Sequence, residues 1–190
     1  MAHSSTRAKA SPVVAAVATG IGAALFFVLG RFAAIPIPFI PNTTINIQYA
    51  ILAVFALLYG PIVACLAGGI GHFLIDVSTY GPWWSWIVAS ALTGLVMGIF
   101  MMRDRVEDSE VGARMIIRFN LAIIIANLVA WLLAAPILDI VFYSEPANKV
   151  FVQGIGAAVS NSVTAAIIGT IIVFAYAKTR TSSGSLSVEE

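Results

Sequence analysis

Apolar residues fill most of the chain in long runs, and short polar or proline-rich segments separate these runs. A helix needs about 20 apolar residues to cross the hydrocarbon core of a bilayer. The run over residues 45–75 is too long for one such helix, and it contains the turn dipeptide Gly60-Pro61 near its middle. The pattern therefore predicts six membrane spans, at Val13–Phe32, Ile45–Tyr59, Pro61–Ile75, Trp83–Met102, Ile116–Leu138 and Val150–Ala177.

The distribution of positive charge supports this division, because Lys and Arg collect in the cytoplasmic segments of membrane proteins. Six spans place both chain ends and the loop after Met102 on one side, which then holds eight of the ten basic residues. The other side holds only Arg31 and Lys149. We therefore expect an all-α integral membrane protein with both termini in the cytoplasm. The membrane domain would cover residues 13–177, between cytoplasmic tails at 1–12 and 178–190.

Composition excludes several other classes of protein. Apolar residues make up 60% of the chain and charged residues 10%, whereas a soluble domain carries about 25% charged residues. The net charge of +1 gives no support for a nucleic-acid partner, and Cys65 has no second cysteine with which to form a disulfide. The sequence contains no P-loop, zinc-protease or nucleophile-elbow motif. We expect a protein that is not an enzyme, uses no cofactor or metal, and has no means of its own to hydrolyse ATP.

Polar and aromatic residues concentrate in three segments on the predicted outer side, at 35–49, 78–86 and 139–149. A mostly apolar ligand pocket with a few placed polar groups needs such residues. The second segment contains Trp83, Trp84 and Trp86. Tryptophan is common at membrane interfaces, but successive helical residues lie about 100° apart, so all three cannot face lipid. They either anchor the interface or form a stacking platform for a flat ligand.

Ionisable side chains within membrane spans are functional candidates, because burying them in lipid is costly. His72 and Asp76 lie four residues apart on one helical face, and they form either a structural pair or a ligand contact. Arg31 either snorkels to the interface or binds a ligand. Together with the outer segments, these give the candidate ligand-binding residues Arg31, Asn42, Thr43, Thr44, Gln48, Tyr49, His72, Asp76, Tyr80, Trp83, Trp84, Trp86, Asn127, Tyr143, Asn148, Lys149 and Gln153.

Two further patterns have open interpretations. Polar stripes follow the last two spans, one with Asn120, Asn127 and Trp131, the other running from Gln153 past Asn161. Such stripes serve either a ligand or hydrogen bonding between helices. Small residues also recur every three or four positions, at Ala16, Gly20 and Ala24 in the first span and at Ala64, Gly68 and Gly71 in the third. These rows either pack against each other or dock another membrane protein.

The chain resembles the substrate-binding S component of an energy-coupling factor (ECF) vitamin transporter. The resemblance extends from Gly20 to Thr181, and its most specific strings are GIGAALFFVLGRFAAIPIPFIPNTTINIQYA, GHFLIDVSTYGPWWSW, RFN, APILDI, EPANKVFVQG and AYAKTRT. One feature departs from the family. S components often carry Ala-x-x-x-Ala in the first span for docking, whereas this chain has Ala16-x-x-x-Gly20.

The resemblance implies a multi-pass protein of the bacterial plasma membrane that binds a vitamin from outside. It also implies a transmembrane coupling protein and two ATPases as partners, with docking through Ala16, Gly20 and Ala24. The strings are similar to those of corrinoid S components, which makes cobalamin the favoured ligand and a thiamine-precursor pyrimidine the alternative. The residues alone leave two other functions open. One is a small intramembrane enzyme that uses His72 and Asp76, and the other is a self-contained channel or carrier.

Overall fold

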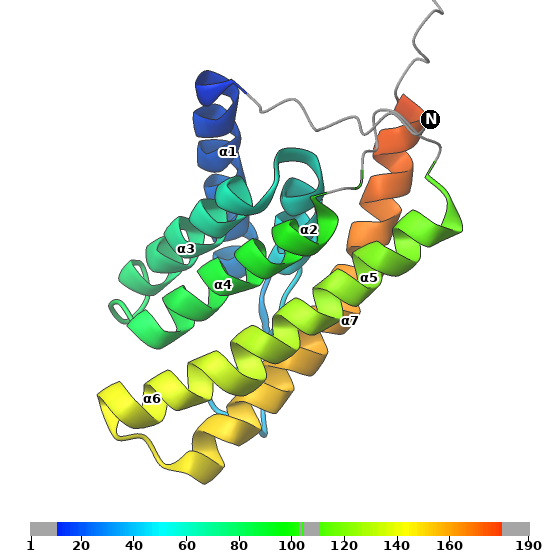
Figure 1. Ribbon diagram of the computed structural model, residues 1–190. Coiled ribbons are helices and arrows are strands. Elements are labelled where there is room, and N and C mark those ends of the chain that lie inside the picture. Colours follow the sequence, from blue (N-terminus) through cyan, green and yellow to red (C-terminus); the bar gives the residue numbers. More distant parts are fainter. Residues whose placement is uncertain (1–10, 103, 105–110, 180–190) are drawn as a thin grey trace, which may run out of the picture.

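The protein, described here by a computed structural model over residues 11–102, 104 and 111–179, is a bundle of helices (Figure 1). Most of both predicted tails lies outside the described residues. The elements in chain order are α1 (Pro12–Phe32), β1 (Ile35–Pro36), β2 (Thr44–Ile45), α2 (Gln48–Tyr59), α3 (Pro61–Val77), α4 (Trp84–Met101), α5 (Ala113–Asn127), the π-helical segment η1 (Leu128–Ala134), α6 (Ala135–Tyr143) and α7 (Ala147–Thr179).

The predicted break at Gly60-Pro61 is confirmed. Gly60 has φ of 91°, a conformation that glycine adopts without steric cost, and it ends α2. Pro61 occupies the start of α3, where its missing N–H is not needed. At the outer side, by contrast, the helix predicted to end at Leu138 continues through η1 and α6 as far as Tyr143.

Within the described residues, four helical segments are long and apolar enough to cross a membrane: Pro12–Phe32, Trp84–Met101, Ala113–Tyr143 and Ala147–Thr179. The other two apolar helices are shorter, since α2 has 12 residues and α3 has 17. The start of α1 and the end of α7 lie at the same end of the bundle (Figure 1), as the six-span topology requires. Six complete crossings and cytoplasmic termini stay predictions.

Helix α2 lies at the centre of the bundle, where it contacts α1, α3, α4 and α7. Most of its residues are buried, including Tyr49 and Leu52. The segment over residues 33–47 precedes α2 and forms a small antiparallel β1–β2 ribbon, of which β2 contacts α7. A cavity lies between this segment and the N-terminal end of α2.

Small residues bring α3 and α4 into close contact. A side chain at Gly94 would meet the backbone of Ala64, and one at Gly68 would meet the backbone of Ser90. The small-residue row of the third span therefore packs inside the bundle. Large apolar side chains cover the outside of the helices, as in a surface that faces lipid. Such a bundle suits the hydrocarbon interior of a membrane.

Candidate functional site

A cavity of about 600 Å³ lies between residues 33–47 and helices α2, α3, η1 and α7. A second cavity of about 280 Å³ shares Asn42, Tyr80 and Trp86 with the first and extends toward α6. Ligand pockets in proteins measure about 300–1,000 Å³, so the larger space alone is sufficient for a small organic molecule.

The two cavities bring together most of the predicted ligand-binding residues. The larger is lined by Arg31, Asn42, Thr43, Thr44, Gln48, Tyr49, His72, Tyr80 and Trp86. The smaller adds Trp83, Lys149 and Gln153. The remaining candidates line neither cavity: these are Asp76, Trp84, Asn127, Tyr143 and Asn148. Of these, Asp76 and Asn127 are fully buried, whereas Asn148 is exposed.

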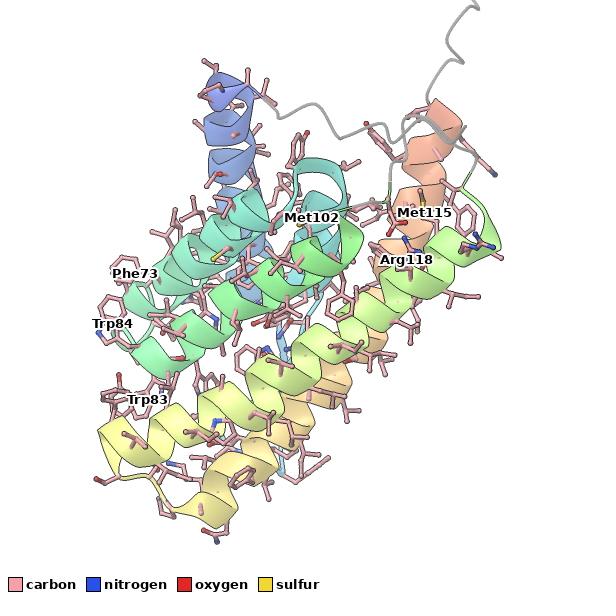
Figure 2. The ribbon with its side chains drawn as sticks, viewed as in Figure 1. Phe73, Trp83, Trp84, Met102, Met115 and Arg118 are labelled. Atoms are coloured by element: carbon pink, nitrogen blue, oxygen red, sulfur yellow. The ribbon has the colours of Figure 1, made fainter. Side chains whose placement is uncertain are left out.

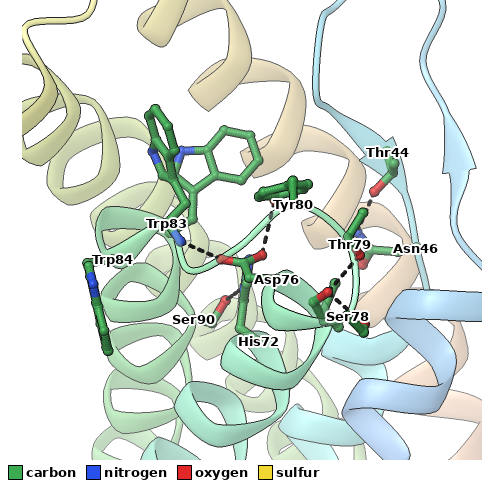
Figure 3. A network of polar contacts seen from close by, with 12 residues as sticks. Thr44, Asn46, His72, Asp76, Ser78, Thr79, Tyr80, Trp83, Trp84 and Ser90 are labelled. Carbon is green, nitrogen blue, oxygen red and sulfur yellow. Dashed lines mark hydrogen bonds and ion pairs between the residues drawn. The ribbon is translucent and has the colours of Figure 1, made fainter.

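Asp76 joins the end of α3 to the start of α4 (Figure 3). Its carboxylate accepts hydrogen bonds from the backbone N–H of Trp83 at 2.9 Å and from the hydroxyl of Tyr80 at 3.0 Å. Its carbonyl oxygen accepts three backbone N–H groups of the following turn. Burial and the neighbouring Asp76 carboxylate raise the pKa of the Tyr80 phenol above its ordinary value, which keeps this hydroxyl a donor. Asp76 thus shapes the turn that carries Tyr80 to the cavity.

His72 connects this carboxylate to the centre of the bundle. Its Nε2 atom lies 3.5 Å from Asp76 Oδ1, and its Nδ1 atom lies 2.5 Å from the hydroxyl oxygen of Ser90. Ser90 in turn lies 2.7 Å from the hydroxyl of Tyr49. The chain of contacts orients the imidazole and the phenol, both of which line the larger cavity. Among the described residues, no cluster of three or more His, Cys, Asp or Glu side chains could hold a metal ion.

The three tryptophans of the second outer segment have different environments. Trp83 stacks on Tyr143 with ring centroids 4.2 Å apart. Trp86 lies inside, with its ring edge toward Trp131. Trp84 instead stacks on Phe73 at the outer side of α3 and α4 and is 56% exposed (Figure 2). Trp83 and Trp86 thus line a cavity, whereas Trp84 lines neither cavity and is exposed. The stacking platform and the interface anchor stay predictions.

Asp139 of α6 is the residue that the sequence argument missed. Its carboxylate accepts hydrogen bonds from the indole N–H groups of Trp83 at 2.7 Å and Trp86 at 2.9 Å, and from the hydroxyl of Ser85. The side chain is almost completely buried. The predicted span ends at Leu138, which places Asp139 in an outer loop. An acidic residue directly after an apolar run, in a chain with few acidic residues, was the available signal.

The π-helical segment η1 places Trp131 against the larger cavity. Pro136 follows it and lacks the N–H that a regular helix would use, and single π-turns often occur at functional sites. The Trp131 ring stacks on His72 with centroids 6.2 Å apart and meets Tyr49 edge to face at 5.9 Å. A side chain at Gly154 would collide with the Trp131 carbonyl, so glycine is needed for α7 to approach this segment.

Residues 33–47 form one wall of the larger cavity and are held against α7. The amide of Gln153 donates to the carbonyl of Pro41 at 2.8 Å, and the hydroxyl of Ser160 donates to the carbonyl of Thr44 at 3.3 Å. Gly156 leaves room for Ile40, since a side chain there would approach it within 2.8 Å. This wall is therefore joined to α7 by a few contacts rather than by a continuous sheet.

Charge is sparse at the larger cavity, whereas the lining of the smaller one includes Asp139, Glu145 and Lys149. Arg31 is exposed and lies over the ring of Phe32, 5.5 Å from its centroid. At the smaller cavity, Lys149 donates to Glu145 at 2.7 Å. The remaining lining of the larger cavity consists of aromatic rings, amides, hydroxyls and aliphatic groups. Such a site suits a largely neutral ligand with a ring system and several hydrogen-bonding groups.

Comparison with known proteins gives a consistent result. A family model described as "ECF-type riboflavin transporter, S component" matches residues 11–178. The UPF0397 protein of Lacticaseibacillus casei (strain BL23) is 51% identical over 95% of this chain and 97% of its own length. A UPF0397 protein of Streptococcus gordonii is 52% identical over 90% of this chain and 91% of its own length.

Among solved structures, FolT bound with folic acid matches with a TM-score of 0.60 at 15% identity, over 90% of this chain and 96% of that chain. At this level of identity the likeness concerns the fold alone. Both proteins share the same arrangement of helices over most of their length.

Proposed function

We propose a vitamin-capture function for this chain, which belongs to the family of ECF-type riboflavin transporter S components. Membership makes it a multi-pass protein of the bacterial membrane and a transport subunit. In the proposed function, it binds a vitamin from outside in the cavity beneath residues 33–47. It then delivers this vitamin inward with a transmembrane coupling protein and two ATPases. The observation that carries the proposal is the largely uncharged, aromatic and amide-lined cavity in a chain whose sequence holds no energy-converting motif.

The proposed coupling surface is the row Ala16, Gly20 and Ala24 on α1. All three residues are exposed, and a side chain at Gly20 would meet nothing within 4 Å. On another face of the same helix, a side chain at Gly22 would approach Phe55 within 2.9 Å. The row is therefore free to contact another helix, and small residues permit close approach between helices in lipid.

For the ligand we propose cobalamin, on the resemblance of the sequence strings to corrinoid S components. The cavity supports this choice through its neutral amides and hydroxyls, including Asn42, Thr43 and Gln48, which suit the many carboxamides of a corrinoid. A smaller flat vitamin is the second candidate. The volume of about 600 Å³ suits a molecule of that size. The matched family is described by riboflavin, and the solved structure of similar fold holds folic acid. A thiamine-precursor pyrimidine belongs to this second group.

Ligand binding tests the proposal directly. The purified chain is titrated with cyanocobalamin, cobinamide, riboflavin, folic acid and the hydroxymethylpyrimidine precursor of thiamine, and any co-purified corrinoid is detected by its visible absorbance. We expect saturable, tight binding of one of these vitamins. Binding of riboflavin or folic acid but not cyanocobalamin would refute cobalamin as the ligand and leave vitamin capture standing. No binding of any of these vitamins would refute vitamin capture itself.

Reconstitution separates the proposal from a self-contained carrier. The chain is placed in liposomes either alone or with the coupling protein and ATPases from the same bacterium, and uptake of the bound vitamin is measured. We expect uptake only with the partners and ATP. Uptake by the chain alone would contradict the proposed subunit role.

A further inference from the structure

Three polar side chains on the wall of the larger cavity have no hydrogen-bond partner within the described residues. These are Gln48 of α2, Trp131 of η1 and Asn161 of α7, and each is at least 95% buried. The unpartnered atoms are Gln48 Oε1, Trp131 Nε1 and Asn161 Oδ1. Buried polar groups are nearly always hydrogen-bonded, so an unpartnered set at one cavity calls for an explanation.

Asn46 Oδ1 at this cavity also has no partner, but the amide nitrogen of the same side chain donates to Thr44 at 3.2 Å. Several other polar side chains here have partners in the protein. Tyr49 and His72 both contact Ser90, and Ser160 nearby contacts the carbonyl of Thr44. The three unpartnered groups come from three different helical segments, and a single local distortion does not account for them. We propose that Gln48, Trp131 and Asn161 form a recognition subsite for a neutral edge of the ligand that carries adjacent N–H and C=O groups, as a lactam or a carboxamide does. This inference rests on the proposed vitamin capture and names the chemical groups of the ligand that the site recognises.

The chemistry follows from the groups themselves. A carboxamide side chain offers an acceptor oxygen and a donor NH2 group next to each other, and a half-turn of the amide exchanges them. An indole N–H can only donate. Two amides and one fixed donor complement a ligand edge in which a carbonyl oxygen and an N–H group alternate. A carboxylate or phosphate would find no counter-charge among these three side chains.

The indole is held in place before any ligand arrives. Trp131 is stacked on His72 and packed edge to face against both Tyr49 and Trp86. Gly154 allows α7 to lie against the Trp131 backbone. These contacts fix the direction of the N–H bond, and a pre-oriented donor loses little conformational freedom on binding.

Substitution by apolar residues of similar shape tests the subsite, because it should change stability and binding in opposite directions. Gln48→Met and Asn161→Leu each remove an unpartnered polar group, so the ligand-free protein should be as stable as the wild type or more stable. Each should nevertheless weaken binding of the vitamin by about tenfold or more, since a hydrogen bond to the ligand is lost. Trp131→Phe should weaken binding similarly.

Asn120→Leu is the matched control. Its amide already donates to Thr170 at 3.1 Å and to the carbonyl of Ile116 at 2.9 Å, and it does not line either cavity. This variant should lower the melting temperature without changing the dissociation constant. The same change of residue type, Asn to Leu, thus gives opposite expectations at positions 120 and 161.

The measurements are thermal unfolding of each ligand-free variant and titration with cyanocobalamin and riboflavin in parallel. Two further comparisons use altered ligands. Riboflavin is compared with 3-methylriboflavin, in which the lactam N–H is blocked, and cyanocobalamin is compared with a derivative in which one carboxamide is a carboxylate. The subsite is supported if the variants are as stable as the wild type or more stable and bind the vitamin more weakly. Their loss of affinity should also be smaller for a blocked analogue than for the parent vitamin. Wild-type affinity in Gln48→Met and Asn161→Leu, or a parallel fall of stability and affinity, overturns it. If the wild type binds neither these vitamins nor folic acid nor the pyrimidine, the vitamin-capture function itself fails, and this subsite fails with it.

Discussion

Removing the carboxylate of Asp139 should disrupt the outer end of the bundle more than its position near a helix end suggests. The carboxylate receives the indole N–H groups of Trp83 and Trp86 and the hydroxyl of Ser85, and its side chain is 2% exposed. Asp139→Ala would leave three donors unpaired, the buried hydroxyl of Ser85 and the half-buried indoles of Trp83 and Trp86. A fully buried donor without a partner costs about 1–3 kcal/mol, and a half-buried one costs less. The three lost hydrogen bonds to a charged acceptor add up to about 3–5 kcal/mol of stability, since each such bond contributes about 1.5–3 kcal/mol and the half-buried indoles can relax toward water.

The effect extends to the ligand, since Trp83 and Trp86 both line the smaller cavity and Trp86 also lines the larger one. Without Asp139, their indoles lose the contact that orients them. We therefore expect vitamin affinity to fall by about tenfold or more in Asp139→Ala. Asp139→Asn keeps one acceptor oxygen but turns an NH2 group toward a donor, so it should be intermediate.

Ser85→Ala supplies the graded control. It removes one donor and leaves the carboxylate with both indoles, so the loss should be about 1–2 kcal/mol. The assay is thermal unfolding of the purified chain followed by tryptophan fluorescence, with titration of the bound vitamin. For a chain of this size, the Asp139→Ala loss corresponds to a melting temperature lower by roughly 10 °C.

An unchanged melting temperature in Asp139→Ala would contradict this expectation. Burying a carboxylate in a membrane protein is itself costly. If Asp139→Ala unfolds at the wild-type temperature and binds normally, the cost of burying the carboxylate balances the three hydrogen bonds. In that case, Asp139 does not organise the tryptophans.

Two further substitution pairs test the coupling surface and the tryptophans. Gly20→Leu on the exposed face of α1 should keep vitamin affinity but abolish co-purification with the coupling protein and ATP-driven uptake; normal assembly would refute the docking surface. Gly22→Leu, on a face packed within 3.0 Å of neighbouring side chains, should instead lower the yield of folded protein and its melting temperature. Trp83→Phe loses the bond to Asp139 and should weaken vitamin binding by about tenfold, whereas Trp84→Phe, at an exposed position, should leave affinity within about twofold. Equal effects at both tryptophans, measured by titration, would contradict the different environments assigned to them.

Much of the helix pattern could be read from the sequence, because it depends on local chemistry. Gly60-Pro61 divides a long apolar run through a positive φ at Gly60 and the preference of Pro61 for the first turn of a helix. The outer boundary after Leu138 was wrong by several residues. The charge of Asp139 is typical of a loop residue. In the structure this charge is compatible with a helix because the indoles of Trp83 and Trp86, at the start of α4, donate to its carboxylate.

The candidate site was predictable in composition but not in geometry. The outer segments supplied most of the residues that line the cavities, since polar groups in an apolar chain have few other uses. Which of them meet depended on distant contacts. The indole of Trp86 and the carboxylate of Asp139 are 53 positions apart, and Gln48 of α2 and Asn161 of α7 line one cavity although 113 positions separate them.

The sequence by itself determined the membrane environment, the approximate helices, the near-neutral character of the site and the family resemblance. Only the tertiary structure decided which faces turn inward. In a soluble helix, an apolar stripe marks the buried face. In a membrane helix, lipid is as apolar as the protein core, so that contrast is weak. The exposed face of Gly20, the packed face of Gly22 and the cavity-facing position of Trp131 become distinguishable only when the helices are assembled.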